Sequence, residues 1–176
     1  GYTHSFTYDG NGNVTSETGG NGNTTVYTYD PLNRVIAAKN GENGISQVAY
    51  DADGRMTKVI DEEGGETSYI YDEDDRLISM TDAEGYSTTF TYDAMDRVVT
   101  ITDAKGGVTR YTYTDRGEVA TKTDAEGYVT SYEYDGNGNC VKMTTVDGDT
   151  IYEYDPLDRL IKTTTPDGES TSMTYD

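Results

Sequence analysis

Carboxylate side chains are the groups in this sequence whose types and spacing could do chemistry. Residues 9–13 and 135–139 both read Asp-Gly-Asn-Gly-Asn and match the first five places of a calcium-binding loop. The sixth and twelfth places of such a loop are Gly and Glu, whereas the second segment has Cys140 and Val146 there, and the first segment fails at the same places. We therefore favour ordinary turns, in which Asp and Asn tolerate left-handed backbone, and keep a calcium-binding repeat as a lesser alternative.

A second arrangement to consider is a general acid and base formed by Asp72, Asp74 and Asp75. Catalysis of this kind needs carboxylates in a cleft, where their pKa values are separated. Carboxylates here recur at turn-forming segments throughout the chain, where side chains are exposed by default. The single His4 and the single Cys140 lie far apart in the sequence, so no transition-metal site is indicated. The sequence predicts no enzymatic activity and no cofactor.

The net charge of the chain limits the kinds of partner that it can be expected to bind. The net charge is −20, with 33 acidic residues against 13 basic ones. Nucleic-acid binding depends on Lys and Arg that neutralise phosphates, and anionic lipid surfaces attract basic segments. No run of residues approaches the ~18 apolar residues of a helical membrane span. We therefore expect neither a nucleic-acid partner nor membrane insertion.

The carboxylates belong to a sequence that repeats along the whole chain. One tyrosine recurs at steps of 21 residues, with a single step of 20, and a period this regular indicates a repeat architecture. We interpret residues 1–176 as one array of about eight units with incomplete terminal repeats, as in a piece excised from a longer protein. The recurring tyrosines are Tyr8, Tyr29, Tyr50, Tyr71, Tyr92, Tyr113, Tyr134, Tyr154 and Tyr175.

Each unit is predicted to contain two strands and two turns. In the unit from Tyr71, residues 76–81 and 86–92 are rich in Thr, aliphatic and aromatic residues, which favour strands, and acidic turn segments precede each of them. The expected fold is all-β: tandem 21-residue hairpins in a curved, spiralling antiparallel sheet, because long twisted sheets do not stay flat. The glycines expected at the second turn of the units are Gly64, Gly85, Gly106, Gly127, Gly148 and Gly168.

Aromatic residues alternate along the second strand of each unit. Phe90 and Tyr92 are two residues apart and therefore share one face, so stacked copies predict two ladders of rings. The first strand is ambiguous, because Leu77 is apolar but so are Ile78 and Met80, which a regular strand would place on the opposite face. The second ladder consists of Tyr27, Tyr69, Phe90, Tyr111, Tyr132 and Tyr152.

The tyrosines also allow a second function. Exposed rings stack on sugars, and acidic or amide groups accept hydrogen bonds from sugar hydroxyls, so a glycan-binding or adhesion module at a cell surface is an alternative. Rings that pack on one another as ladders would instead be structural. With 17 Tyr, 2 Phe and no Trp, tyrosine carries most of the large apolar surface in either case.

The repeated motif resembles a known family. Its opening, Tyr-Asp followed after three residues by Arg, is clearest at residues 29–35, 71–77, 92–98 and 154–160, which read YDPLNRV, YDEDDRL, YDAMDRV and YDPLDRL. Together with the Thr-Asp-x-x-Gly and Tyr-x-Tyr-Asp segments, this pattern is similar over the whole chain to the YD or RHS repeat. The family includes bacterial RHS polymorphic toxins, toxin-complex shell proteins, wall-associated proteins and animal teneurins.

The resemblance implies a structural role. In that family the repeats build a hollow β-shell, which in the toxins encloses a C-terminal toxic segment. The implied function is a wall segment that encapsulates or displays an attached polypeptide, whose partner is the rest of its own parent chain. The parent would be secreted or at the cell surface of a bacterium. The family's DPxG-type closing segment has no counterpart, because Pro31 and Pro156 are each followed by Leu.

The two ends of the array suggest self-association. Residues 2–8 and 170–175 are the expected first and last strands, and neither carries a Pro, a bulge signal or an inward charge that would protect a sheet edge. We predict end-to-end pairing of the final strand of one molecule with the first strand of the next. Salt should strengthen this association, because it screens the repulsion between molecules of charge −20.

Overall fold

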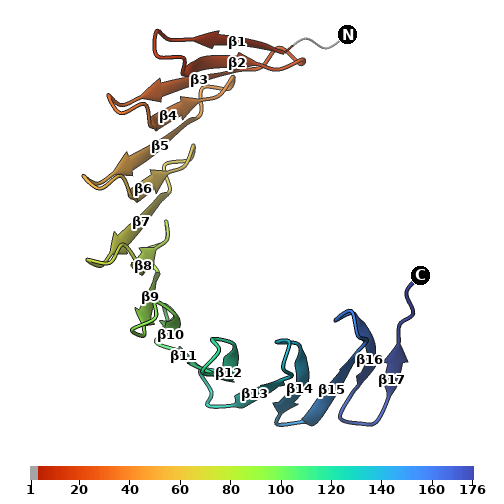
Figure 1. The fold of residues 1–176 in the computed structure, drawn as a ribbon. Coiled ribbons are helices and arrows are strands. Elements are labelled where there is room, and N and C mark those ends of the chain that lie inside the picture. Colours follow the sequence, from red (N-terminus) through yellow and green to blue (C-terminus); the bar gives the residue numbers. More distant parts are fainter. Residues whose placement is uncertain (1–3) are drawn as a thin grey trace. The chain divides into compact units, whose positions relative to one another are not determined.

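The computed structural model describes residues 4–176, and every regular element in them is a β-strand. The prediction of an all-β fold is confirmed. The chain divides into two compact units, Gly1–Thr88 and Thr89–Asp176, in each of which consecutive strands lie side by side in chain order (Figure 1). No helix in residues 4–176 is suited to cross a membrane.

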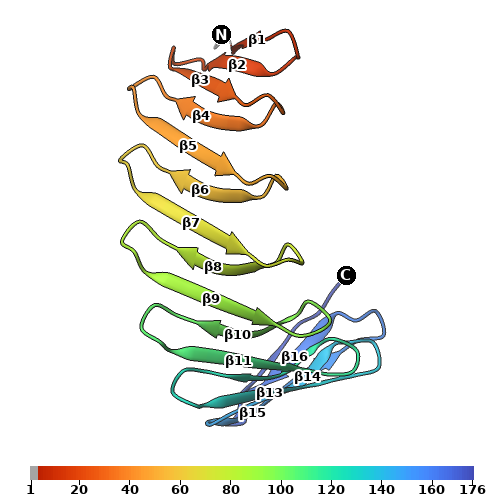
Figure 2. The same cartoon turned by 90° about the vertical axis from the view of Figure 1, so that its left-hand side faces the viewer.

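The first unit is an antiparallel meander in which each strand pairs with its neighbour in the sequence (Figure 2). Its strands alternate in direction, so that the two kinds of turn lie at opposite edges of the strip. The strands are β1 (Ser5–Tyr8), β2 (Val14–Thr18), β3 (Thr24–Tyr29), β4 (Val35–Lys39), β5 (Ile45–Tyr50), β6 (Met56–Ile60), β7 (Glu66–Tyr71) and β8 (Leu77–Thr81).

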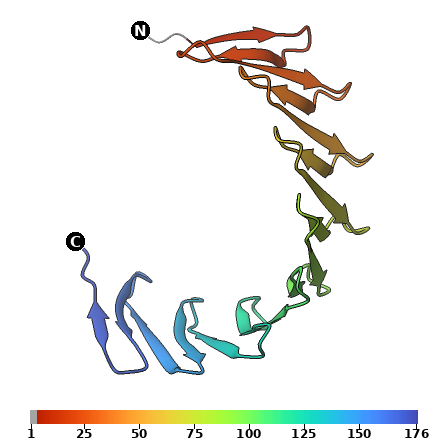
Figure 3. The same ribbon diagram turned by 180° about the vertical axis from the view of Figure 1, so that it is seen from behind.

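The second unit repeats this arrangement, and β9 (Ser87–Tyr92), which spans the unit boundary, pairs with β10. Figure 3 shows the hairpins from behind, with turns at both ends of the strands. The further strands are β10 (Val98–Thr102), β11 (Val108–Tyr113), β12 (Val119–Thr123), β13 (Val129–Tyr134), β14 (Cys140–Thr145), β15 (Gly148–Tyr154), β16 (Leu160–Thr164) and β17 (Ser170–Ser172).

Nearly all the turns share one backbone geometry. At the turn that opens with Asp93, the N–H of Asp96 donates to the carbonyl of Asp93 at 3.1 Å, and the N–H of Asp93 donates to the carbonyl of Arg97 at 2.9 Å. Asp96 has φ +61°, in the left-handed region that Gly, Asn and Asp adopt most readily. The second bond makes the arginine part of the turn, which explains why the strand begins one residue later than predicted. The six predicted turn glycines all have positive φ, between +83° and +119°.

One hairpin is tighter than the others. Thr145 pairs directly with Gly148, so only Val146 and Asp147 form the loop. This two-residue loop accounts for the single 20-residue step in the repeat. Gly148 has φ +119° there.

A β-bulge in every unit resolves the ambiguity of the first strand. Tyr71 lies opposite Leu77 and Tyr69 lies opposite Met80, with a shift of register between the two pairs. Residues directly opposite in an antiparallel pair share a face, so Leu77 and Met80 are on the same side as the tyrosines. The expectation that Met80 faces away from Leu77 is therefore wrong, because the bulge inserts one extra residue between them.

The sheet has two different faces and no buried core among residues 4–176. We call the side with the tyrosine ladders the aromatic face and the other side the threonine face, on which Thr91 and Thr100 hydrogen bond through their hydroxyls at 2.6 Å. In the described part of the chain, residues 4–176, no hydrophobic residue is buried, and Thr150, at 9% exposure, is the one buried residue. Each unit is therefore a single layer rather than two packed layers.

The last strand is shorter than predicted. β1 runs from Ser5 to Tyr8, and residues 2 and 3 of the expected first strand lie outside the described residues. β17 ends at Ser172 rather than at Tyr175. Beyond it the N–H of Met173 still donates to the carbonyl of Ile161 at 2.9 Å, and the Tyr175 Oη donates to the carbonyl of Leu160 at 2.8 Å. This bond of Tyr175 is the same one that Tyr154 makes, within its strand, to the carbonyl of Cys140 in the repeat before it.

Candidate functional site

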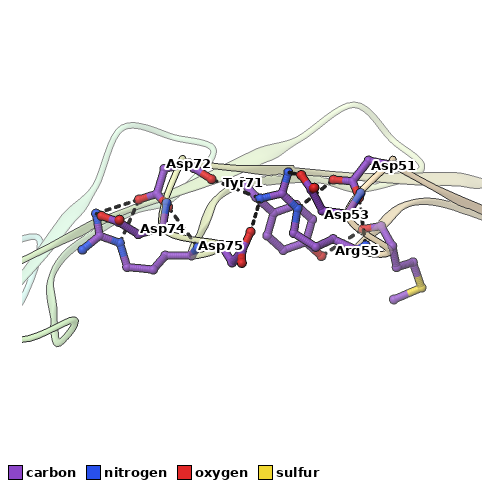
Figure 4. Close-up of polar contacts among 9 residues, drawn as sticks. Asp51, Asp53, Arg55, Tyr71, Asp72, Asp74 and Asp75 are labelled. Atoms are coloured by element: carbon purple, nitrogen blue, oxygen red, sulfur yellow. Dashed lines mark hydrogen bonds and ion pairs between the residues drawn. The ribbon is translucent and has the colours of Figure 1, made fainter.

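The recurrent cluster of this protein joins one repeat to the next. In its best-defined copy, the carboxylate of Asp51 accepts hydrogen bonds from the backbone N–H of Arg55 at 2.9 Å and from its Nε at 2.7 Å (Figure 4). The same arginine donates through Nη1 to the carbonyl of Asp72 in the next repeat, at 3.1 Å. The aspartate therefore aims the guanidinium of Arg55 at the following repeat.

A tyrosine from the next repeat completes the cluster. The guanidinium carbon of Arg55 lies 5.2 Å from the centre of the Tyr71 ring, within the range of a cation–π contact. The Oη of Tyr71 donates to the carbonyl of Met56 at 2.9 Å, so that the hydroxyl end of the ring is bonded to backbone of the preceding repeat. We call this set of an aspartate, an arginine and the next tyrosine a joint.

The joint recurs with similar dimensions in both units. The arginine–ring distance is 4.5 Å for Arg34 and Tyr50, 4.4 Å for Arg97 and Tyr113, and 4.7 Å for Arg159 and Tyr175. The tyrosine hydroxyl donates to a backbone carbonyl of the preceding repeat also where no arginine precedes it. The donors with printed distances between 2.6 and 3.0 Å are Tyr29, Tyr50, Tyr71, Tyr113, Tyr134, Tyr154 and Tyr175.

The joint aspartates are held in their ionised form. The pKa of Asp93 lies below its ordinary value of 3.8, chiefly because the Arg97 side chain donates to it, with further donation from the backbone of Arg97 and Met95. The pKa values of Asp30, Asp72 and Asp155 are lowered by the same kinds of contact, with the backbone N–H of the arginine as the first cause. Each carboxylate therefore accepts hydrogen bonds both from the backbone of its own turn and from the arginine side chain.

Acid is expected to stabilise the protein slightly and then unfold it. Between neutral pH and the pI of about 4.1, protonation reduces the self-repulsion of the acidic chain. The stability contributed by the joint aspartates is present above their ordinary pKa of 3.8 and is lost as the pH falls through their lowered folded values. Thermal unfolding followed by circular dichroism should show a maximum Tm near the pI and a steep loss below it. A Tm that keeps rising in stronger acid would contradict this result.

The two segments that resemble calcium loops form ordinary turns. The carboxylate of Asp135 accepts from the N–H of Asn137 and Asn139, each at 2.9 Å, and from the Asn139 amide at 3.0 Å. Asp9 makes the equivalent bonds to Asn11 and Asn13. Within residues 4–176 no group of three or more His, Cys, Asp or Glu side chains is placed to hold a metal ion. These carboxylates therefore accept hydrogen bonds from their own turns and do not face a common site.

Calcium is expected to raise the Tm only as much as magnesium or an equal ionic strength of simple salt does. The physical reason is that divalent cations screen the charge of −20 without occupying a defined site. Thermal scans over a calcium titration, with magnesium and sodium chloride as controls, measure this. A large saturable gain that only calcium produces would instead indicate a specific site.

The predicted ladder residues are placed as follows. The tyrosines Tyr29, Tyr50 and Tyr71 and their equivalents through Tyr154 are half-buried, whereas Tyr8 and Tyr175 are exposed. The second ladder is half-buried throughout: Tyr27, Tyr69, Phe90, Tyr111, Tyr132 and Tyr152. The turn carboxylates Asp53, Glu63, Asp74 and Glu84 are exposed, in contrast to these half-buried rings.

The three carboxylates considered as an acid and base, and the single cysteine, contact residues of the repeats instead. Asp72 holds Arg76, and Asp74 lies 3.1 Å from the same guanidinium. Asp75 accepts from Arg55, so these three carboxylates serve two different joints (Figure 4). Cys140 is half-buried opposite Tyr134, where other repeats have an aliphatic residue.

Sequence reasoning missed the arginines. The sequence pattern predicts that the Asp of the YDxxxR motif lies in a turn and that the Arg begins a strand. In the structure both residues also hold the tyrosine of the next repeat. The available signal was their fixed spacing from one another in five repeats, Arg34, Arg55, Arg76, Arg97 and Arg159.

Comparison with known proteins identifies the repeat. The family model described as RHS Repeat matches residues 8–45, 50–85, 71–108, 113–150 and 154–176, which together make up most of the chain. No match is found among curated proteins.

Solved structures with the same fold come from toxin complexes. A crystal structure of TcdB2-TccC3-Cdc42 is similar with a TM-score of 0.79 and 16% identity, over 96% of this chain and 12% of that chain. The structure of a Photorhabdus luminescens Tc holotoxin pore with a TccC3 mutation has a TM-score of 0.73 and 15% identity, over 93% and 12%. A crystal structure of TcdB2-TccC3 has a TM-score of 0.63 and 18% identity, over 98% and 12%. This chain thus spans about an eighth of their length, and the likeness is one of fold.

Proposed function

Because the chain belongs to the RHS repeat family, we propose that it is a segment of the wall of a β-shell that encloses or displays another part of its own parent polypeptide. The proposal includes further repeats in the parent, since solved chains with this fold are about eight times longer. The parent would be a secreted or cell-surface bacterial protein, which the similarity to a Photorhabdus luminescens toxin complex supports.

The observation that carries the proposal is the single-layer construction. No hydrophobic side chain in residues 4–176 is buried, yet one face of each unit carries two ladders of half-buried aromatic rings. A free-standing domain would cover such a face with a second layer of structure. A wall needs only to be continuous, and the joints provide this continuity because each repeat hydrogen bonds to the next through side chains as well as backbone.

Protection from proteolysis tests the proposal. The natural protein that contains these repeats is treated with a broad-specificity protease, and mass spectrometry follows the fragments over time. We expect a segment outside the repeats to survive for much longer than the same segment produced alone. A variant with Asp93→Ala and Arg97→Ala, which breaks one joint, should shorten that survival. Equal cleavage of the attached and isolated segments would reject enclosure.

Carbohydrate binding is a second candidate, which two exposed rings favour. Tyr86 and Tyr128 directly follow the turn glycines Gly85 and Gly127 and are 60% and 59% exposed, unlike the half-buried ladder tyrosines between Tyr29 and Tyr154. An exposed ring at a turn could stack on a sugar, and the −20 charge would favour neutral over anionic glycans. The ladder rings are less suited to this role, because arginines and backbone carbonyls already contact them.

Titration of tyrosine fluorescence with neutral oligosaccharides, such as chitohexaose and cellopentaose, tests this second candidate. Saturable binding that Tyr86→Ala and Tyr128→Ala remove together, but that Thr112→Ala leaves intact, would support it. Thr112 is the matched control because it is an exposed strand residue whose hydroxyl contacts only Thr121 among the described residues. No change of fluorescence with any of these sugars would count against glycan binding.

A further inference from the structure

One joint in the second unit is built from different residues. Thr114 occupies the place of the usual aspartate, and Glu118 occupies the place of the usual arginine. The hydroxyl of Thr114 donates to the carboxylate of Glu118, so the two places still contact each other. Tyr134, the tyrosine of the next repeat, still donates through Oη to the carbonyl of Val119 at 2.9 Å.

Arg116 replaces the missing contact from another position. In the ordinary joint, Arg55 Nη1 donates to the carbonyl of Asp72 at 3.1 Å. Here Arg116 Nη1 donates to the carbonyl of Asp135 at 3.2 Å, and Asp72 and Asp135 hold the same place in their repeats. The link between the two repeats is therefore kept, although its arginine comes from the middle of the turn.

This substitute is more exposed and less tightly held than an ordinary joint. The side chain of Arg116 is 55% exposed, whereas that of Arg97 is 27% exposed. Arg116 Nε lies 3.5 Å from the Glu118 carboxylate, whereas the guanidinium of Arg97 lies 2.7 Å from that of Asp93. Arg97 also stacks on Tyr113 at 4.4 Å, whereas the carboxylate of Glu118, at the equivalent place, cannot form a cation–π contact with Tyr134.

Exposure and distance decide how each joint responds to ionic strength. Charges in contact with water are screened over about 3 Å at 1 M salt, while partly buried pairs are screened much less. An exposed ion pair held at longer distance therefore loses more of its attraction than a short one beneath a ring. A cation–π contact at short range adds stabilisation that does not depend on an exposed pair of charges.

We propose that Arg116 makes the joint between the Tyr113 and Tyr134 repeats a salt-sensitive one, which opens more often as ionic strength rises than the joint of Arg97 does. At low salt, Arg116 holds the turn at residues 114–118 against the next turn. At high salt the attraction between Arg116 and Glu118 weakens, so that the guanidinium is no longer held at the carbonyl of Asp135. The pairing of β12 with β13 then opens locally while the neighbouring joint stays closed. The proposal concerns this chain's own mechanics and does not depend on what the wall encloses.

Hydrogen exchange measured by mass spectrometry compares the two joints within one molecule. We expect exchange in residues 119–134 to accelerate roughly three- to tenfold between low salt and 1 M sodium chloride, the range that loss of one net hydrogen bond gives. Exchange in residues 98–113 should change by much less. This internal comparison removes the general effect of screening the −20 charge, because that effect acts on both joints.

Substitutions assign the effect to Arg116. Arg116→Ala should raise exchange in residues 119–134 at low salt to its high-salt level and remove the salt response. Arg110→Ala is the matched control, since Arg110 is an exposed arginine in β11 with no ion pair among the described residues. It should leave both joints unchanged.

A rescue variant makes the proposal easy to reject. Thr114→Asp combined with Glu118→Arg rebuilds the ordinary pair, so the joint should become insensitive to salt and Arg116→Ala should then have no effect. Equal salt responses at the two joints in the natural protein would overturn the proposal. It would fall equally if Arg116→Ala left low-salt exchange unchanged.

Discussion

Replacing Tyr113 with Ala is expected to lower the free energy of unfolding by about 2–3 kcal/mol, below the ~3–5 kcal/mol of a fully buried ring. The ring is half-buried, Arg97 stacks on it at 4.4 Å, and its hydroxyl donates to the carbonyl of Val98 at 2.6 Å. Both contacts connect one repeat to the one before it. Urea denaturation followed by circular dichroism measures the change.

Two variants separate the contributions at this tyrosine. Tyr113→Phe keeps the ring and loses only the hydrogen bond, so we expect a loss of about 1 kcal/mol. Tyr128→Ala removes an exposed ring and should change stability by no more than about 0.5 kcal/mol. If Tyr113→Ala also cost no more than that, the ladder would be an open surface rather than a connection between repeats.

The second large effect is expected at the tight hairpin. Gly148→Ala should cost about 2–3 kcal/mol, because a side chain at φ +119° is strained and its Cβ would lie 3.1 Å from the Cβ of Pro166 in the next turn. Val146 and Asp147 alone close this loop, so the backbone has little freedom to relax. Urea denaturation is again the measurement.

Gly136→Ala is the matched control for the tight hairpin. Gly136 does not have a positive φ, and nothing lies within 4 Å of where its Cβ would be. Its replacement should be neutral or slightly stabilising, because Ala restricts the unfolded chain. If the two variants lost similar stability, the strain at Gly148 would not be the cause.

The sequence predicts the elements of this fold well because residues close together in the sequence specify each turn. Asp at the start of a turn and Gly, Asn or Asp at its fourth place mark the positions where the backbone must reverse. The strand faces could not be assigned in the same way. An extra residue such as Ile78 is not distinguished by its type from its neighbours in the strand, so only the pairing of Tyr69 with Met80 reveals the bulge.

The joints were harder to predict than the turns. Asp51 and Arg55 are four residues apart, and their pairing follows from a local pattern. That Arg55 then lies over Tyr71 depends on how consecutive hairpins are placed, which no local spacing specifies. The exchanged residues Thr114 and Glu118 stand out in the sequence, yet the compensation by Arg116 is visible only when the neighbouring turn is in place.

The lack of buried hydrophobic side chains in residues 4–176 has a calorimetric consequence. The heat capacity gained on unfolding comes mainly from newly hydrated apolar surface, and ordinary domains gain about 12–15 cal/mol/K per residue. A single sheet whose rings are already partly exposed to water gains less newly hydrated surface on unfolding. Its heat capacity increment should therefore be small for its length, and its stability should depend on temperature along an unusually flat curve.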